Sequence, residues 1–372
     1  MTHAVYLDYN ATTPVAPEVA DAVDRANREL WGNPSSVHEY GRAARRAVEQ
    51  AREQVARLLG CAADEIVFTS GGTESDNAAI FGVAEALGTR GRHLVISAVE
   101  HAAVDAACRS LEQRGYEVTR IGTDASGRVS AAEVEAALRP DTILVSLIHG
   151  QNETGVLQPV EEVGRIARSR AIVFHTDTAQ SVGKLAVDVD RLPCDLATVA
   201  GHKLYGPKGV GALYVRRATP FRGLLRGAAH EAGRRSGTEN VGGIVGLGVA
   251  CELATRELPA RTRHLAALRE RLSARLCASV PDLVVHGAGA PRLPNTLSVA
   301  FPGATGAEVA ARAAGVAVAA GAACHSGTAH VSRVLTAMGV SRELALATLR
   351  LSVGCPTTED DVDAAAESIA RA

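Results

Sequence analysis

The sequence predicts an α/β fold in which a mostly parallel sheet carries helices on both faces. From about residue 40 to residue 250, apolar runs of strand length alternate with helical stretches, and this alternation is typical of βαβ units. The length of 372 residues also exceeds what one small core needs. We therefore expect a large α/β domain over residues 15–250 and a smaller α+β domain over 251–372, completed by residues 1–14.

The expected elements follow from the apolar pattern along the chain. The apolar runs of strand length are 65–69, 93–98, 142–148, 171–175, 196–200, 210–215, 283–286 and 295–301. The helical patterns cover 42–59, 77–87, 104–114, 160–169, 241–249, 252–278 and about 307–314. The arginine-rich helix over 252–278 interrupts the alternation, so it marks the passage from the first domain to the second.

Composition and charge describe an ordinary globular chain. Hydrophobic residues make up 47%, charged residues 22%, and the net charge is -2, so nothing favours nucleic acid or a membrane as the main partner. No apolar run approaches the ~20 residues of a membrane span, and the first residues lack the basic and apolar regions of a signal peptide. The seven cysteines are scattered without a CxxC pair. We therefore expect no disulfide framework, no metal site and a cytoplasmic location.

Lysine is scarce, and its placement is informative. The chain has only three lysines, Lys184, Lys203 and Lys208, while arginine supplies nearly all the other positive charge. Lys203 lies in a glycine-rich loop between the apolar runs 196–200 and 210–215, which places a primary amine on a turn between two strands. A lysine can lose its proton and form an imine, whereas a guanidinium cannot. The alternative is a plain surface lysine in a turn.

A second polar cluster joins a strand end to a helix through glycines. Residues 69–77 contain Gly72 and Thr73, and a helix amino terminus approached by glycines suits a phosphate group. The competing explanation is a helix cap made by Thr73 or Ser75. The segment does not match the phosphate-binding loop of nucleoside triphosphatases.

Three more polar residues follow predicted strands. Asp177 ends an apolar run and needs a cationic or protonated partner if it is buried. The alternative is a purely structural role, in which Asp177 caps the next turn. His101 could stack on a flat ring or merely end a strand. Asn152 could donate to a ring hydroxyl or a substrate carboxylate, or form a turn. A lysine, a strand-end aspartate and a phosphate seat are the contacts that pyridoxal phosphate requires.

Taken together, these motifs resemble the cysteine desulfurase family, in the class V aminotransferase-like branch of fold-type I pyridoxal phosphate enzymes. The resemblance covers nearly the whole chain in the family's order. It rests on residues 7–14, 33–38, 69–77, 100–101, 152–155, 177–183, 202–209, 235–240 and 349–354. It implies a large domain with a seven-stranded type of sheet and a smaller carboxy-terminal domain.

The resemblance also implies a role for each matching residue. Lys203 would form the internal aldimine and remove the substrate α-proton, and Cys324 would receive the sulfur as a persulfide. The implied contacts of the ring are Asp177 to its nitrogen, Gln180 to its oxygen and His101 stacked over its face. The implied phosphate contacts are Gly72, Thr73, His202 and, in the neighbouring subunit, Thr238. The implied substrate contacts are Arg350, which would clamp the carboxylate as a planar fork, Asn152 and Asn33.

Two departures from the family pattern stand out. Ala200 occupies a position where the family usually has a serine, so one hydroxyl to the phosphate is missing. The stretch 320–327 keeps Cys324 but lacks the serine-rich neighbours usual in the family.

The activity implied is removal of sulfur from L-cysteine to give L-alanine, in a homodimer that hands the sulfur to an acceptor protein. Selenocysteine lyases and kynureninase-like or epimerase-like relatives are the alternatives within the fold, although Cys324 favours sulfur transfer. A scaffold without catalysis is an alternative from another class of protein.

Overall fold

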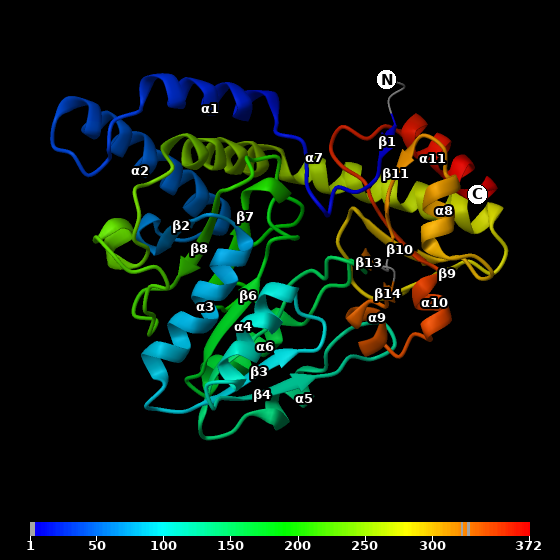
Figure 1. Cartoon of the computed structure of the whole chain (residues 1–372), viewed down its shortest axis with the longest axis horizontal. Coiled ribbons are helices and arrows are strands. Elements are labelled where there is room, and N and C mark those ends of the chain that lie inside the picture. The colour runs from blue at the N-terminus through cyan, green and yellow to red at the C-terminus, as the bar shows by residue number, and fades with distance from the viewer. Residues whose placement is uncertain (1–3, 321–322, 326–327) are drawn as a thin grey trace.

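A seven-stranded, mostly parallel sheet forms the centre of the molecule, as the sequence predicts (Figure 1). The computed structural model describes residues 4–320, 323–325 and 328–372. The strand order is β2-β8-β7-β6-β5-β3-β4, and only β8 runs against its neighbours. The strands are β2 (Ile66–Thr69), β3 (His93–Ser97), β4 (Glu117–Ile121), β5 (Thr142–Ser146), β6 (Val173–Asp177), β7 (Leu196–Ala200) and β8 (Gly211–Val215).

Helices cover both faces of this sheet. One face packs against α2 (Glu39–Leu59), α5 (Ala131–Ala137), α6 (Val160–Ser169) and the first half of α7 (Val241–Ser279). The other face packs against α3 (Gly72–Leu87) and α4 (Ala102–Glu112). Both faces of the sheet are therefore buried, which explains why its strands read as continuous apolar runs.

A second sheet lies at the other end of the molecule. Its order is β12-β15-β10-β9, with all pairs antiparallel. Its strands are β9 (Val284–Val285), β10 (Thr296–Ala300), β12 (Ala319–Ala320) and β15 (Thr348–Ser352). The helices of this region are α8 (Gly306–Arg312), α9 (Arg333–Ala337), α10 (Arg342–Leu346) and α11 (Glu359–Arg371).

The amino-terminal segment joins this second region. Strand β1 (Val5–Tyr6) pairs in parallel with β11 (Val316–Ala317), and Leu7 is fully buried in the carboxy-terminal core. The backbone then bridges Asp8 to Ser352 of β15. Helix α1 (Pro17–Glu29) follows and packs beside α7 (Figure 1). These contacts support the predicted completion of the small domain by residues 1–14, which stays a prediction.

Helix α7 connects the two cores. It supplies Ile244 and Leu247 to the core under the large sheet, and Leu265 and Leu272 to the carboxy-terminal core. The sequence predicts two helices here, over 241–249 and 252–278, and this expectation was wrong because the helix is continuous. The domain boundary proposed at residue 251 therefore falls inside a helix.

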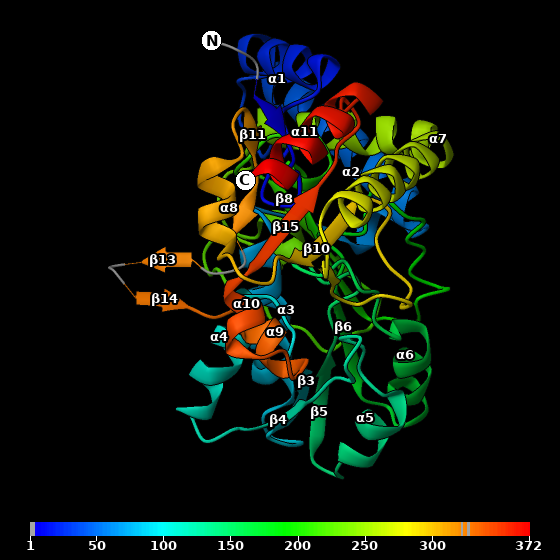
Figure 2. The same ribbon diagram turned by 90° about the vertical axis from the view of Figure 1, so that its right-hand side faces the viewer.

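A hairpin stands out from the side of the molecule, between the two sheets (Figure 2). It consists of β13 (Ala323–His325) and β14 (Thr328–His330), which pair antiparallel. Just after it, Ser332 caps α9 and donates a hydrogen bond to the Glu153 carboxylate (Oγ–Oε2, 2.5 Å). Within the described residues, no helix combines the length and apolar composition that a membrane span requires.

Candidate functional site

The predicted site residues gather at the carboxyl edge of the parallel strands. Because these strand ends meet at one edge of the sheet, residues far apart in the sequence become neighbours. The residues that follow strands there are Thr73 after β2, His101 after β3, Asn152 after β5, Asp177 at the end of β6 and Lys203 after β7.

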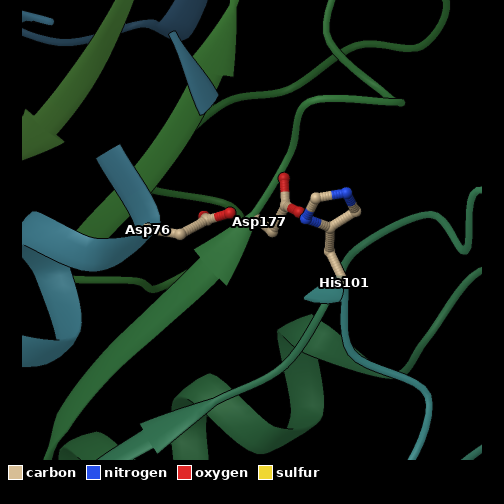
Figure 3. Close-up of side chains that lie close together, drawn as sticks. All are labelled: Asp76, His101 and Asp177. Atoms are coloured by element: carbon tan, nitrogen blue, oxygen red, sulfur yellow. The ribbon is translucent and has the colours of Figure 1, made fainter. Parts of the chain in front are cut away.

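Two buried carboxylates and an exposed histidine lie close together at this edge of the sheet (Figure 3). Ligand atoms of Asp76, His101 and Asp177 all lie within 4.8 Å of one another. Asp177 Oδ1 also accepts a hydrogen bond from the Ala179 N–H (2.9 Å), so the turn-capping role exists beside any functional one. His101 Nδ1 similarly accepts from the Ala103 N–H at the start of α4 (3.2 Å).

Within the described chain, neither carboxylate forms an ion pair with a lysine or arginine, although His101 and Lys203 lie near enough to lower the pKa of Asp177. Burial raises the pKa of Asp76 and of Asp177, and the nearby Asp177 carboxylate raises the pKa of Asp76 further. His175, whose Nε2 lies 3.6 Å from Asp76 Oδ1, is held neutral because burial lowers its pKa to about 3. Among the described residues, Asp76 Oδ1 has no hydrogen-bond partner. A cationic ring nitrogen would satisfy this group. The same atoms could hold a metal ion, so the expected absence of a metal site stays a prediction.

Lys203 presents its amine to the same edge. Its Nζ donates to the carbonyl oxygens of Asn10 and Ala11, the latter at 2.8 Å. Burial and the nearby Arg350 guanidinium lower the pKa of Lys203 to about 8. About a tenth of the amine is therefore unprotonated at pH 7, far more than for an ordinary lysine, and imine formation requires this neutral form.

A second buried amine, Lys184, adjoins this site and was not among the residues chosen from the sequence. Its Nζ donates to Gln180 Oε1 (2.9 Å) and to Asn10 Oδ1 (3.3 Å). Gln180 Nε2 in turn donates to the Asn10 carbonyl (2.9 Å). The scarcity of lysine was a signal that could have drawn attention to Lys184.

The glycine-to-helix junction fits a phosphate seat. Helix α3 begins at Gly72, its N-cap is Gly71, and no side chain caps it, so the alternative of a cap by Thr73 or Ser75 was wrong. Within the described chain, no hydrogen bond satisfies the N–H groups of Gly72 and Thr73. A Cβ on Gly72 would lie 3.4 Å from the Ala200 Cβ. Ala200, which stands where the family usually has a serine, therefore lies next to the predicted phosphate site.

His202 lies beside Lys203 at the same junction. Its Nδ1 is 3.1 Å from Thr12 Oγ1, and burial together with the nearby Lys203 and Lys208 lowers the pKa of His202 to about 4. The ring is therefore neutral at neutral pH. A neutral imidazole can still donate one hydrogen bond to an anion.

Arg350 projects from β15 towards the same edge. Its Nη2 donates to Asp8 Oδ1 (2.6 Å) and its Nη1 to the Asn152 carbonyl (3.2 Å). Among the described residues, the buried Arg350 Nε has no partner. An incoming carboxylate could satisfy that donor.

The turn after β5 is made by the Gln151 side chain, which accepts from the Thr154 N–H (3.0 Å), so the turn does not require the Asn152 side chain.

Two predicted residues line a hollow that contains none of the strand-end residues gathered around Lys203, namely Thr73, His101, Asn152, Asp177 and Lys203 (the Lys203 group). Asn33 and Thr238 line a separate hollow of about 320 Å³, together with the exposed Trp31. None of the residues lining this hollow belongs to the Lys203 group.

The predicted sulfur carrier falls in the hairpin. The backbone of Cys324 belongs to β13, but the side chains of residues 321–330 lie outside the described part of the chain. Six other cysteines are free. Burial raises the pKa of four of these thiols, Cys61, Cys108, Cys194 and Cys251, to about 12, and thiols of such high pKa are poor nucleophiles. The sequence-based rival, Cys355, is half-buried, and its N–H donates to Tyr205 Oη (2.6 Å).

Comparisons with known proteins agree with this arrangement. The family model "Aminotransferase class-V" matches residues 5–365. A protein named cysteine desulfurase IscS from Anaeromyxobacter dehalogenans is 48% identical over 362 residues, which cover 96% of this chain and 90% of the relative.

Solved structures are similar over the same length. A NifS-like protein superposes with a TM-score of 0.92 at 37% identity, covering 99% of this chain and 98% of its own. A protein described as SspA in complex with cysteine gives a TM-score of 0.83 at 37% identity, covering 94% and 98%. A family model and near-full-length relatives thus agree, and the chain belongs to the class-V aminotransferase family, within its cysteine desulfurase branch.

Proposed function

We propose that this desulfurase removes sulfur from L-cysteine with pyridoxal phosphate as its cofactor and Lys203 as its reactive amine. One observation carries the proposal: the desolvated Lys203 amine lies at the same sheet edge as Asp76 and Asp177, two buried carboxylates that form no ion pair with a lysine or arginine of the described chain. The unsatisfied amides at Gly72 and Thr73 suit the cofactor phosphate. When bound, the cofactor supplies an electron sink for the carbanion formed at the substrate α-carbon.

Side chains of the site would contact the cofactor ring, bind the substrate and transfer the proton. Asp177 would keep the ring nitrogen protonated, Gln180 would donate to the ring oxygen, and His101 would lie against the ring. Arg350 would bind the substrate carboxylate through its unsatisfied Nε–H. Lys203 Nζ would then take the α-proton, a task for which a pKa of about 8 is well placed.

The sulfur would pass to Cys324. Its thiolate attacks the substrate sulfur, an S–S bond forms, the C–S bond breaks, and its electron pair stays with the carbon that becomes the methyl group of alanine. The products balance as L-alanine and a persulfide on Cys324. The raised pKa of the four buried thiols supports this assignment, with Cys355 and the exposed Cys277 as the remaining competitors.

A homodimer would complete the site. Thr238 lines a hollow together with Asn33 and the exposed Trp31. A partner subunit packed on this hollow could receive Thr238 at its phosphate seat and Asn33 at its substrate site. The acceptor of the sulfur is expected to be another protein, and the cytoplasmic location predicted from the scattered cysteines stays a prediction.

Incubation of the purified, cofactor-loaded protein with L-cysteine and a reductant tests the activity by release of alanine and sulfide. Lys203→Ala should lose the borohydride-reducible link to the cofactor, with Lys208→Ala as the matched control. Cys324→Ala should bind cofactor and cysteine yet release almost no sulfide. A reducible link at Lys208, or a persulfide mapped by mass spectrometry to Cys355, would contradict the assignment.

The same experiment separates the alternatives. A protein that binds no cofactor would be a scaffold, and one that releases selenium from selenocysteine but no sulfide from cysteine would be a selenocysteine lyase. Metal analysis of the purified protein tests whether the Asp76 and Asp177 carboxylates bind a metal ion instead.

A further inference from the structure

Lys184 is buried in an arrangement that is costly unless it has a role. Only 5% of its surface is exposed, and its Nζ donates only to two neutral amide oxygens, of Gln180 and Asn10. No carboxylate of the described chain forms an ion pair with it. Burial, with Lys203 and Arg350 nearby, lowers the pKa of Lys184 to about 7. Lysines are rarely buried without a counter-ion, because desolvation of the charge is unfavourable.

The amine restricts how the Gln180 amide can point. When Lys184 is protonated, its ammonium group donates hydrogen bonds and accepts none, so the Gln180 oxygen faces Lys184 and the NH₂ group faces the opposite side. There, Nε2 donates to the Asn10 carbonyl (2.9 Å). A flipped amide would bring NH₂ against the ammonium and oxygen against a carbonyl oxygen, losing both bonds.

The orientation of the Gln180 amide is linked by hydrogen bonds to the residues that the proposed function uses. The Asn10 carbonyl that accepts from Gln180 also accepts from Lys203 Nζ. The Asn10 side chain is fixed as well, since its Nδ2 donates to Thr296 Oγ1 (2.8 Å) and to the Asn152 carbonyl (3.1 Å), which also accepts from Arg350. Asn10 is almost completely buried. A change at Lys184 is therefore transmitted to Lys203 and Gln180 through a few short contacts.

We propose that Lys184 is a positioning residue that holds the Gln180 amide with its N–H donors towards the cofactor ring oxygen and the Asn10 carbonyl, which also accepts from Lys203. The inference rests on the proposed function, because Gln180 contacts the ring oxygen only if the cofactor binds as described. Without Lys184, one of the two hydrogen bonds that favour this orientation is lost and only the bond to the Asn10 carbonyl is kept, so the amide offers the ring oxygen an acceptor in a larger share of the molecules.

Lys184→Met tests this proposal, with Lys208→Met as a control on an exposed lysine near Lys203. Two quantities are measured without substrate: the dissociation constant of pyridoxal phosphate and the pH at which the visible absorbance of the bound cofactor changes. Loss of one donor to the ring oxygen should weaken cofactor binding roughly 3- to 10-fold and move the absorbance transition to higher pH, because the ionised ring oxygen is less stabilised. Lys208→Met should leave both unchanged.

A second variant keeps the test valid if Lys184→Met folds poorly. Gln180→Glu gives Lys184 a carboxylate partner, which favours folding, but it removes the N–H donors. It should shift the absorbance in the same direction, and in a Gln180→Leu background Lys184→Met should add no further shift. Unchanged absorbance in both Lys184→Met and Gln180→Glu, or a full additional shift in the Gln180→Leu background, would overturn the positioning role. Failure of Lys203→Ala to lose its borohydride-reducible link would instead overturn the proposed function.

Discussion

Breaking the buried ion pair between Arg52 and Glu231 should cost the protein about 3–5 kcal/mol of stability, the amount typical when one partner of a buried pair is left without the other. Arg52 on α2 donates two parallel bonds to the Glu231 carboxylate, at 2.7 and 2.9 Å, and both side chains are under one-tenth exposed. The Phe68 N–H donates to the same carboxylate (2.8 Å). Arg52→Met would leave the buried Glu231 with that single donor.

A surface pair provides the matched control. Arg217 Nη2 lies 2.6 Å from Asp64 Oδ1, but both side chains are more than half exposed, so Arg217→Met should destabilise the fold far less than Arg52→Met. Urea unfolding of the cofactor-free variants, followed by circular dichroism at one protein concentration, measures the difference. The double variant Arg52→Met/Glu231→Leu should recover much of the loss. If Arg52→Met is no less stable than Arg217→Met, the buried pair does not stabilise the fold as argued.

The remaining predictions concern the cofactor and pH. Thr238→Val should loosen cofactor binding if Thr238 reaches the partner subunit, and a tightly cofactor-loaded monomer in sedimentation would contradict the shared site. Ala200→Ser should tighten cofactor binding by about 1.5–3 kcal/mol by adding a hydrogen bond to the phosphate; an unchanged dissociation constant would show that the position needs no hydroxyl. Burial lowers the pKa of His149 from 6.5 to about 4, so its stabilising contribution is complete above pH 6.5 and is lost as the pH falls towards 4. Between pH 7 and pH 5, the free energy of unfolding of His149→Gln should therefore fall by roughly 2 kcal/mol less than that of the parent protein. Urea unfolding at the two pH values measures this difference, and an equal fall in both proteins would refute the reasoning.

The sequence was most informative where strands are buried on both faces. Strands β5 and β7 appear as continuous apolar runs, and the structure places both in the sheet centre. The edge strand β4 was missed because it contains Glu117, Thr119 and Arg120, which are at least partly exposed. The start of α3 was placed at residue 77 instead of Gly72, because glycine and threonine are weak helix formers.

Some residues of the candidate site could be predicted from the sequence and others could not. Lys203 and Asp177 could be chosen because each follows an apolar strand, and strand ends meet at one edge of a parallel sheet. Asp76 and Lys184 were missed because their positions depend on packing. Asp76 looks like one more polar residue in the first turn of a helix, and Lys184 follows Gly183 in an apparent turn, yet both side chains are almost fully buried.

The pairing of the amino-terminal segment with β15 sets an order of events during synthesis. Asn10 donates its N–H to Ser352 Oγ, and these residues are 342 positions apart. At about 5–20 residues per second, a ribosome needs roughly 17–70 s to make the chain between them. The carbonyl that accepts from Lys203 therefore has no fixed place until β15 has emerged. The reactive amine should become able to take up its cofactor only late in translation, or after release from the ribosome.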